Sequence, residues 1–281
     1  MTVAQYREVK LSWSRLRTHD ECPAKGDLLA RRQKSPVANV RNFIHGNVCD
    51  LAMRRWLAMG EQEPGWMARH VDELFDESVE KARSTGDGVV RWRHADDRDE
   101  TREFCRECVT RLEPLLVKYC LPFDWLPAWR FSVPLTIHYG RELREITITG
   151  EIDLLVFDRF GRVWIWDLKA TKDNEYYRKV LGQLAFYAIA IKASKEGKLG
   201  RWPVRAGLLQ PMCATPDLMV DIMADGGQAI REMATRIERV AGDIWAGRLD
   251  PNPGDRCPWC EVKHACPVFA VPADGKLLLT A

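Results

Sequence analysis

The amino-acid sequence predicts an α/β or α+β fold in which a central sheet lies between helices. Three observations predict this fold. Helical patterns open the sequence, mainly antiparallel strand patterns rich in Ile, Val, Leu and Trp begin near Trp129, and a helix and a further strand follow. With 281 residues, of which 46% are hydrophobic and 29% charged, the chain can form one large domain with insertions or two modest domains.

The region before the sheet is predicted to be helical. The first expected helix covers residues 11–32, with Ser12 or Ser14 as its N-cap. The second covers residues 43–57, which carry an apolar stripe at helical spacing. Residues from about 66 to 120 are charged and mostly helical in pattern. We therefore predict a helical insertion between the first helices and the sheet.

The predicted sheet has four strands, joined by turns and helices. Strands are expected at residues 131–138, 145–157, 162–169 and 204–210. Residues 158–161 supply the turn between the second and third strands. Helices are expected at residues 175–195 and 227–246, and a segment rich in Pro, Gly and Cys follows.

The composition limits the classes of protein to consider. The formal net charge is only +2, from 42 Lys and Arg against 40 Asp and Glu, so a nucleic-acid-binding surface must arise from a local arrangement of charges. There is no run of about 18 or more apolar residues, and the N-terminal residues lack the apolar core of a signal peptide. We therefore expect no membrane association and a cytosolic location. Nine cysteines in that compartment favour metal ligation over disulfide bonds.

Two aspartates on the second and third strands are predicted to face each other. If the hairpin is symmetric about Phe160, Asp153 lies opposite Asp167, and alternation along the strand puts Lys169 on the same side. Two opposed carboxylates on a buried sheet would lie about 5 Å apart and would need a cation or a strongly raised pKa on one acid. Oxygen ligands in this number suit Mg²⁺ or Mn²⁺. Lys169 could then orient a water or stabilise phosphoryl charge.

The spacing of these two acids alone is equally compatible with solvated acids at strand ends. A second pair of polar residues occurs on the following helix, where Gln183 and Tyr187 lie four residues apart on one face. This pair can project towards a metal site or a phosphate, or it can belong to the polar stripe of an amphipathic helix. Both interpretations remain open for the residues taken separately.

Taken together, these residues resemble the PD-(D/E)xK nuclease superfamily, and specifically its RecB-like branch. Residues 150–153 (Gly-Glu-Ile-Asp), the turn and residues 167–169 (Asp-Leu-Lys) match G-x-x-D and D-x-K, and residues 183–187 match Q-x-x-x-Y. The resemblance implies a restriction-endonuclease-like fold: a mixed central sheet flanked by helices, with a helical insertion and a C-terminal iron–sulfur segment.

The resemblance also implies roles for individual residues. Divalent metal would be bound by Asp153, Asp167 and the backbone carbonyl of Leu168. Lys169 would position the nucleophile or stabilise the developing charge. Gln183 and Tyr187 would orient the substrate or Lys169.

One position departs from the family pattern. The branch usually carries G-x-x-x-H on an early helix, with the histidine as a metal ligand, whereas Asp50 stands four residues after Gly46 in this sequence. Aspartate is a competent and harder ligand for Mg²⁺, so Asp50 is the candidate third ligand, with a shifted metal preference. His45 lies on another side of the helix, and we expect it to be a surface histidine rather than a substitute ligand.

Four cysteines form a candidate cofactor site. Three of them follow a C-x2-C-x5-C spacing near the end of the sequence: Cys257, Cys260 and Cys266. The fourth, Cys22, precedes a proline near the start. Four thiolates can hold a [4Fe–4S] cluster or zinc, and His264 would also permit zinc. The resemblance favours the cluster, because RecB-like nucleases of the AddB type and those of CRISPR spacer acquisition carry one N-terminal Cys before Pro and three near the C-terminus.

The function implied by this resemblance is hydrolysis of DNA phosphodiester bonds. We expect an exonuclease that acts on DNA ends, single-stranded ends especially, in recombination, repair or phage or CRISPR DNA processing. Its location would be a bacterial, archaeal or phage-infected host cytosol, and its partners would be DNA and recombination or CRISPR-adaptation proteins. The alternatives are a catalytically weakened DNA-binding adaptor and a structure-specific endonuclease on the same fold.

The expected domain organisation has four parts. They are the N-terminal helices with the first cluster cysteine (1–58), the helical insertion (59–128), the nuclease core (129–247) and the C-terminal cysteine segment (248–281). The cluster would join the first of these parts to the last and would therefore be mainly structural.

Overall fold

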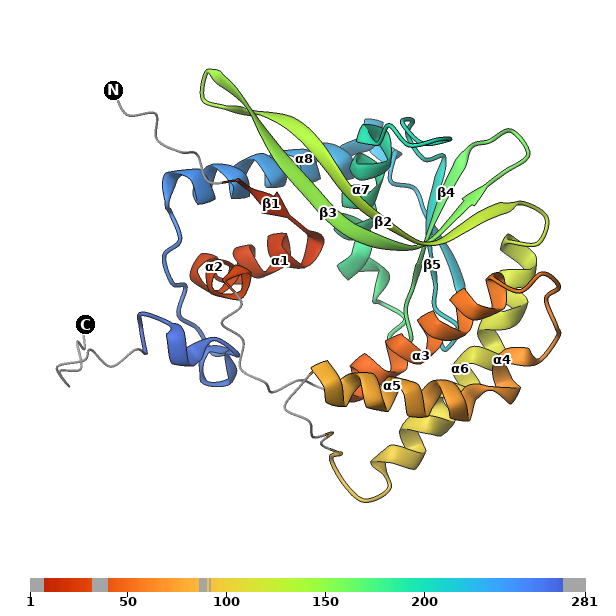
Figure 1. Cartoon of the computed structure of the whole chain (residues 1–281). Coiled ribbons are helices and arrows are strands. Elements are labelled where there is room, and N and C mark those ends of the chain that lie inside the picture. Colours follow the sequence, from red (N-terminus) through yellow and green to blue (C-terminus); the bar gives the residue numbers. More distant parts are fainter. Residues whose placement is uncertain (1–7, 32–39, 86–89, 91, 270–281) are drawn as a thin grey trace. The chain divides into compact units, whose positions relative to one another are not determined.

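The computed structural model describes residues 8–31, 40–85, 90 and 92–269 (Figure 1). The chain forms two compact units. The first unit consists of Met1–Val37, Pro134–Ile148 and Thr235–Ala281, and the second of Ala38–Val133 and Thr149–Ala234. Three elements run through both units: strands β2 (Asp124–Tyr139) and β3 (Glu142–Phe157) and helix α8 (Ala224–Ala246).

The strands form a mixed six-stranded sheet, which confirms the predicted α/β architecture. Within the second unit, β3 is antiparallel to β4 (Val163–Leu168), β4 is parallel to β5 (Arg205–Leu209), and β5 is antiparallel to β6 (Asp217–Val220). In the first unit, β1 (Lys10–Leu11) pairs in parallel with the N-terminal part of β3, and β2 also pairs with β3. The four expected strands all correspond to strands of this sheet, whereas the sequence pattern does not predict β1 or β6.

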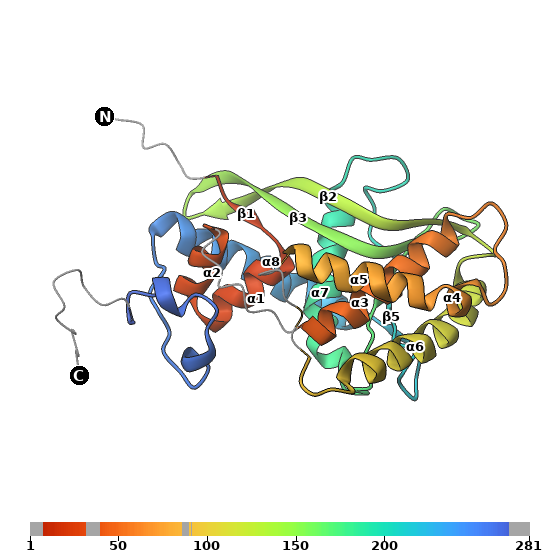
Figure 2. The same cartoon turned by 60° about the horizontal axis from the view of Figure 1, so that its bottom comes forward.

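Helices cover both faces of the sheet in the second unit. α5 (Val71–Thr85) and α6 (Asp97–Tyr119) pack on α3 (Val40–Leu57), and the short α4 (Trp66–Arg69) joins them (Figure 2). Together they bury an apolar cluster with Leu154, Trp164 and Trp166 of the sheet. On the other face, α7 (Tyr177–Ala193) packs against β4 and β5. The helical character predicted for residues 66–120 is therefore confirmed for the described part of this stretch.

The prediction of one helix over residues 11–32 is wrong, because the first unit contains α1 (Trp13–Glu21) and α2 (Pro23–Ala30) instead. Cys22 separates them with an extended backbone, at φ −164° and ψ 112°. The ring of Pro23 disfavours a helical conformation in the residue before it, which explains the interruption. Arg32, the last residue of the predicted helix, lies outside the described residues.

The starts of two helices agree with the sequence analysis. Ser12 is the N-cap of α1, since its hydroxyl accepts a hydrogen bond from the amide of Arg15 at 3.2 Å. The backbone of Asp225, Gly226 and Gly227 is left-handed, so the regular part of α8 begins near the predicted residue 227. Two short 3-10 helices, η1 (Cys257–Trp259) and η2 (Lys263–Ala265), follow α8. Within the part of the chain that the structure describes, none of the helices could span a lipid bilayer.

Gly150 allows β3 to pass close to an aromatic ring in the second unit. A Cβ atom at this position would lie 2.7 Å from Cζ of Phe131. That ring packs against Trp129 and Phe186, so it has little room to move. We expect Gly150→Ala to lower the free energy of unfolding by about 1–3 kcal/mol through overpacking. Urea denaturation of the two proteins measures the difference.

Gly46→Ala is the matched control for this substitution. Gly46 lies in α3, and an added Cβ atom would meet nothing within 4 Å. Because alanine has the higher helix propensity, we expect this variant to be as stable as the unsubstituted protein or more stable by up to about 1 kcal/mol. An unchanged stability of Gly150→Ala would contradict the close approach as the reason for glycine at that position.

Candidate functional site

β3 and β4 form the hairpin that carries the two predicted aspartates. Leu154 pairs with Trp166, and the pairs that follow towards the turn keep the hairpin symmetric about residue 160, as predicted. Continued by one residue, the same register aligns Asp153 with Asp167. Both side chains therefore lie on the face opposite to that of the buried tryptophan.

Asp153 and Asp167 are held by different groups. An oxygen of Asp153, which is partly exposed, accepts a hydrogen bond from the backbone amide of Leu168 at 2.7 Å. Asp167 is fully buried, and one of its carboxylate oxygens lies 2.5 Å from Nζ of Lys169. The end of the hairpin thus brings together two carboxylates and one ammonium group.

The closeness of these groups affects their ionisation. Burial and the charge of Asp167 raise the pKa of Asp153 to about 7. Burial favours the neutral form of Lys169, but the charges of Asp167 and Asp153 outweigh this effect and raise its pKa. When both acids are ionised, one ammonium leaves a negative charge uncompensated. A hard divalent cation with oxygen ligands would compensate it.

α7 contributes Gln183 and Tyr187 to the same site. Nε2 of Gln183 donates hydrogen bonds to Asp167 at 3.2 Å and to the hydroxyl of Tyr187 at 2.7 Å. Burial, together with the charges of the two aspartates, raises the pKa of Tyr187, so its phenol stays protonated. Gln183 therefore links the carboxylate of Asp167 to a neutral phenol.

Asp50 of α3 is connected to the hairpin by Arg54, which binds both Asp50 and Glu151. Nε of Arg54, one turn later on α3, donates to Asp50 at 2.7 Å, and the same guanidinium binds Glu151 of β3. Nε of Arg130 on β2 donates to the other oxygen of Glu151 at 2.5 Å. Burial raises the pKa of Asp50 in spite of Arg54, and the charge of Asp50 contributes to the raised pKa of Asp153.

Arg54 and Arg130 are site residues that the sequence did not predict, and Glu151 was not predicted to be their partner. The spacing of Asp50 and Arg54 by four helical residues is the signal that could have identified that pair. Arg130 had no comparable signal, because its contact to β3 depends on how β2 lies beside it.

The expected surface position of His45 is wrong, because its side chain is only 7% exposed. Its ring stacks on Phe104 of α6, with 4.2 Å between ring centroids. Burial lowers the pKa of His45 to about 4, so the imidazole is neutral at pH 7. The residues of α3 alone do not reveal this burial, since it is α6 that covers the histidine.

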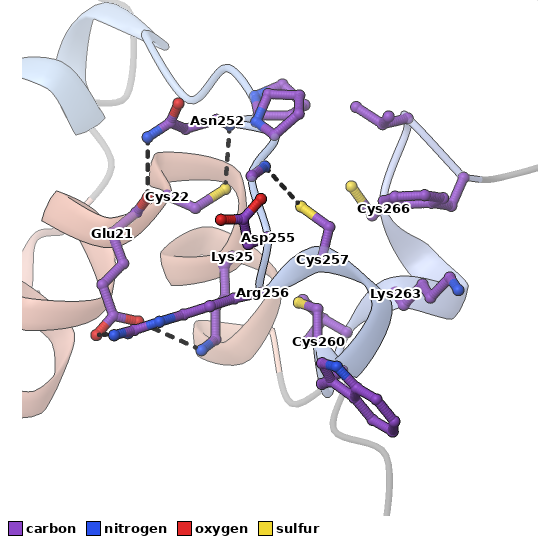
Figure 3. A pocket seen from close by; sticks show the side chains of 17 residues that line it. Glu21, Cys22, Lys25, Asn252, Asp255, Arg256, Cys257, Cys260, Lys263 and Cys266 are labelled. Carbon is purple, nitrogen blue, oxygen red and sulfur yellow. Dashed lines mark hydrogen bonds and ion pairs between the residues drawn. The ribbon is translucent and has the colours of Figure 1, made fainter.

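Four cysteines of the first unit line one cavity of about 400 Å³ (Figure 3). They are Cys22, between α1 and α2, and Cys257, Cys260 and Cys266 in the segment of η1 and η2. Sγ of Cys22 accepts a hydrogen bond from the amide of Asn252 at 3.3 Å, and Sγ of Cys257 accepts one from the amide of Gly254 at 3.2 Å. His264 is exposed and is not among the residues that line the cavity.

Backbone amides commonly donate hydrogen bonds to the sulfur atoms of metal-bound cysteines. Among the described residues, no three cysteine sulfur atoms all lie within 4.8 Å of one another.

One other group of metal-ligand types exists among the described residues. It consists of His94, Asp97 and Glu100, whose ligand atoms lie within 4.8 Å of one another. The carboxylate of Asp97 already accepts hydrogen bonds from the backbone and the guanidinium of Arg93. The guanidinium of Arg93 therefore already balances the charge of Asp97, the buried carboxylate of this group.

The model of the PD-(D/E)XK nuclease superfamily matches residues 10–267 of the chain. No curated protein matches. A solved structure described as "Crystal structure of SSO0001" is 13% identical, with a TM-score of 0.36, and the comparison covers 80% of this chain and 96% of that one.

Proposed function

The chain belongs to the PD-(D/E)XK nuclease superfamily, and from this membership we propose that it is a divalent-metal-dependent deoxyribonuclease of the RecB-like branch. The observation that carries the proposal is the approach of Asp153 and Asp167 beside Lys169 at the end of a buried hairpin. Two carboxylates that face each other on a sheet are destabilising, because their like charges repel. Stability therefore does not explain why both acids are present. The arrangement is what a site for Mg²⁺ or Mn²⁺ requires.

The metal ligands in this proposal are Asp153, Asp167 and the backbone carbonyl of Leu168, with Asp50 as the third carboxylate. A divalent cation held by these residues would polarise a scissile phosphate and lower the pKa of an attacking water. Lys169, held charged by Asp167, donates a hydrogen bond that positions the water or stabilises the charge on the phosphoryl oxygens.

Gln183 is proposed to orient Asp167, and Tyr187 is proposed to orient a phosphate oxygen or a water molecule. The amide of Gln183 fixes one oxygen of Asp167, which leaves the orientation of that carboxylate well defined. The protonated phenol of Tyr187 is a hydrogen-bond donor that a phosphate oxygen or a water can accept. These two residues of α7 are therefore proposed as catalytic residues alongside Asp153, Asp167 and Lys169.

We also propose that Cys22, Cys257, Cys260 and Cys266 hold a [4Fe–4S] cluster. The four side chains line one cavity, which supports a shared cofactor. The resemblance to RecB-like nucleases of the AddB type favours the cluster over zinc. The amides that donate to the sulfurs of Cys22 and Cys257 suit thiolate ligands. The cluster would join α1 and α2 to the segment that follows α8.

The substrate that we propose is the end of a DNA strand, preferably single-stranded, during recombination, repair or the processing of phage or CRISPR DNA. This part of the proposal rests on the resemblance to RecB-like nucleases with an iron–sulfur cluster. Recombination or CRISPR-adaptation proteins are the corresponding candidate partners.

The purified protein is expected to degrade end-labelled linear DNA with Mg²⁺ or Mn²⁺ and to leave covalently closed circles intact, because an exonuclease needs an end. Single-stranded DNA is expected to disappear faster than blunt duplex. Gel analysis of the products over time measures both rates. Equal cutting of circular and linear DNA would instead indicate the structure-specific endonuclease.

A second candidate function is a DNA-binding adaptor with weakened catalysis. The observation that favours it is the guanidinium of Arg54, which binds Asp50 where the family usually has a metal-ligand histidine. The same assay separates the two. Absence of any cleavage with Mg²⁺ and Mn²⁺, together with retained DNA binding, would favour the adaptor.

A further inference from the structure

Glu151 holds two arginines from different elements at the edge of the hairpin site. It lies two residues before Asp153 on β3, so the two side chains are on the same face, about 7 Å apart along the strand. Arg54 of α3 binds one oxygen of Glu151, and Arg130 of β2 binds the other. Each carboxylate oxygen therefore has its own guanidinium.

Stability is a weak explanation for this arrangement. The side chain of Arg130 is 79% exposed, and an ion pair at such an exposed position contributes about 0–1 kcal/mol to folding. The two guanidiniums nevertheless hold both oxygens of the Glu151 carboxylate in fixed positions.

The chemistry of the two guanidiniums matches a phosphate as well as a carboxylate. Arginine presents a planar set of N–H donors that binds either anion through paired hydrogen bonds. A phosphodiester offers two charged oxygens, as the Glu151 carboxylate does. The two guanidiniums that hold Glu151 therefore present the set of donors that a phosphate of a DNA strand would bind.

We propose that Arg54 and Arg130 form the binding site for a phosphate that neighbours the scissile one, and that Glu151 occupies this site in the DNA-free protein. The inference rests on the proposed nuclease function, which puts the scissile phosphate at Asp153 and Asp167. Entry of the strand then requires the Glu151 carboxylate to leave the arginines. Glu151 is in this view a competitor of DNA, and the arginines are substrate-binding residues.

The test is the affinity for a short fluorescein-labelled oligothymidylate, measured by fluorescence anisotropy with Ca²⁺ in place of Mg²⁺ over a range of salt concentrations. A gel verifies that the probe stays intact. Arg130→Gln is expected to weaken binding and to reduce the slope of log affinity against log salt by about 0.7, the value for one lost phosphate contact on a single strand. Glu151→Gln is expected to tighten binding about two- to fivefold, because the competing anion is gone.

Arg54→Gln is expected to resemble Arg130→Gln. Since Arg54 is partly buried and also binds Asp50, its substitution can disturb folding, and the exposed Arg130 then carries the test alone. A thermal melt of each variant establishes whether it is folded.

α3 supplies a matched control pair. Arg55, the next residue, binds Glu77 of α5 in an ion pair outside the hairpin site. Arg55→Gln and Glu77→Gln change the same residue types and are expected to leave affinity and salt slope unchanged.

Two results would overturn the inference. One is a wild-type affinity and salt slope for both Arg130→Gln and Glu151→Gln. The other is a loss of Mn²⁺ binding in Glu151→Gln by titration calorimetry, which would make Glu151 a metal ligand. Because binding is measured apart from cleavage, a protein that shows the expected binding changes but cuts no DNA would refute the nuclease proposal and not the phosphate site.

Discussion

Asp153→Asn is expected to abolish metal-dependent DNA cleavage while the protein remains folded. The asparagine oxygen can still accept the hydrogen bond from the amide of Leu168, so the hairpin keeps its geometry. The anionic ligand is lost, however, and with it the metal that contributes several kcal/mol to the reaction, which corresponds to a rate about 10³-fold lower or more. Initial rates on labelled single-stranded DNA over a range of Mg²⁺ and Mn²⁺ concentrations measure the effect.

The same substitution is expected to stabilise the metal-free protein at neutral pH. The pKa of Asp153 is raised to about 7 in the folded state, so folding retains a proton there that the unfolded chain releases. An acid with a raised folded pKa makes stability fall as pH rises from the ordinary aspartate range to about 7. Asparagine removes this loss. The melting temperature of the variant in EDTA should therefore exceed that of the unsubstituted protein at about pH 8 and match it at about pH 4.

Metal and a control variant complete this experiment. Mn²⁺ at pH 8 is expected to raise the melting temperature of the unsubstituted protein and not that of Asp153→Asn, because only a folded site with both acids binds it. Asp124→Asn is the control, since Asp124 is exposed on β2 and pairs with Lys198 at 2.6 Å. If Asp153→Asn cleaves DNA at the full rate and with the same metal dependence as the unsubstituted protein, Asp153 is not a metal ligand.

The hairpin could be predicted from the sequence because its chemistry is local. Strand alternation and a short turn fix which residues face each other, so a turn centred on residue 160 is enough to align Asp153 with Asp167. The same holds for Gln183 and Tyr187, whose spacing puts both on one helical face. The hydrogen-bond partners of these residues could not be predicted from their spacing. The hydrogen bond from Gln183 to Asp167 forms because α7 packs on β4.

Contacts between distant elements could not be predicted in this way. The burial of His45 depends on Phe104, which belongs to a different helix, and the position of Arg130 depends on a neighbouring strand. The strands β1 and β6 have two and four residues, too few to show a periodicity of their own. The break at Cys22, in contrast, could have been predicted from the sequence, because Pro23 restricts the backbone of the residue before it.

If the four cysteines hold the proposed iron–sulfur cluster, Cys22→Ser is expected to remove its visible absorbance and to destabilise the first unit. Cys22 is the one proposed ligand that lies between α1 and α2, and the other three follow α8. A cross-link between such distant residues restricts the unfolded chain strongly, and for a loop of this length the entropic model of cross-linking gives on the order of 5 kcal/mol. Serine is nearly isosteric but binds iron poorly, so both the cluster and this stabilisation should be lost.

The measurement is made on protein purified without oxygen, by absorbance, by iron and sulfide analysis, and by urea denaturation. Cys213→Ser is the control, because Cys213 belongs to the second unit and donates only to the carbonyl of Thr171, a bond that a hydroxyl can replace. It should keep both the absorbance and most of the stability. A colourless protein that contains one zinc ion would indicate that the same four cysteines bind zinc and not a cluster. The expected loss of stability would be unchanged, since either cofactor restricts the unfolded chain in the same way. If the unsubstituted protein contains neither metal and Cys22→Ser is equally stable, the four cysteines hold no cofactor.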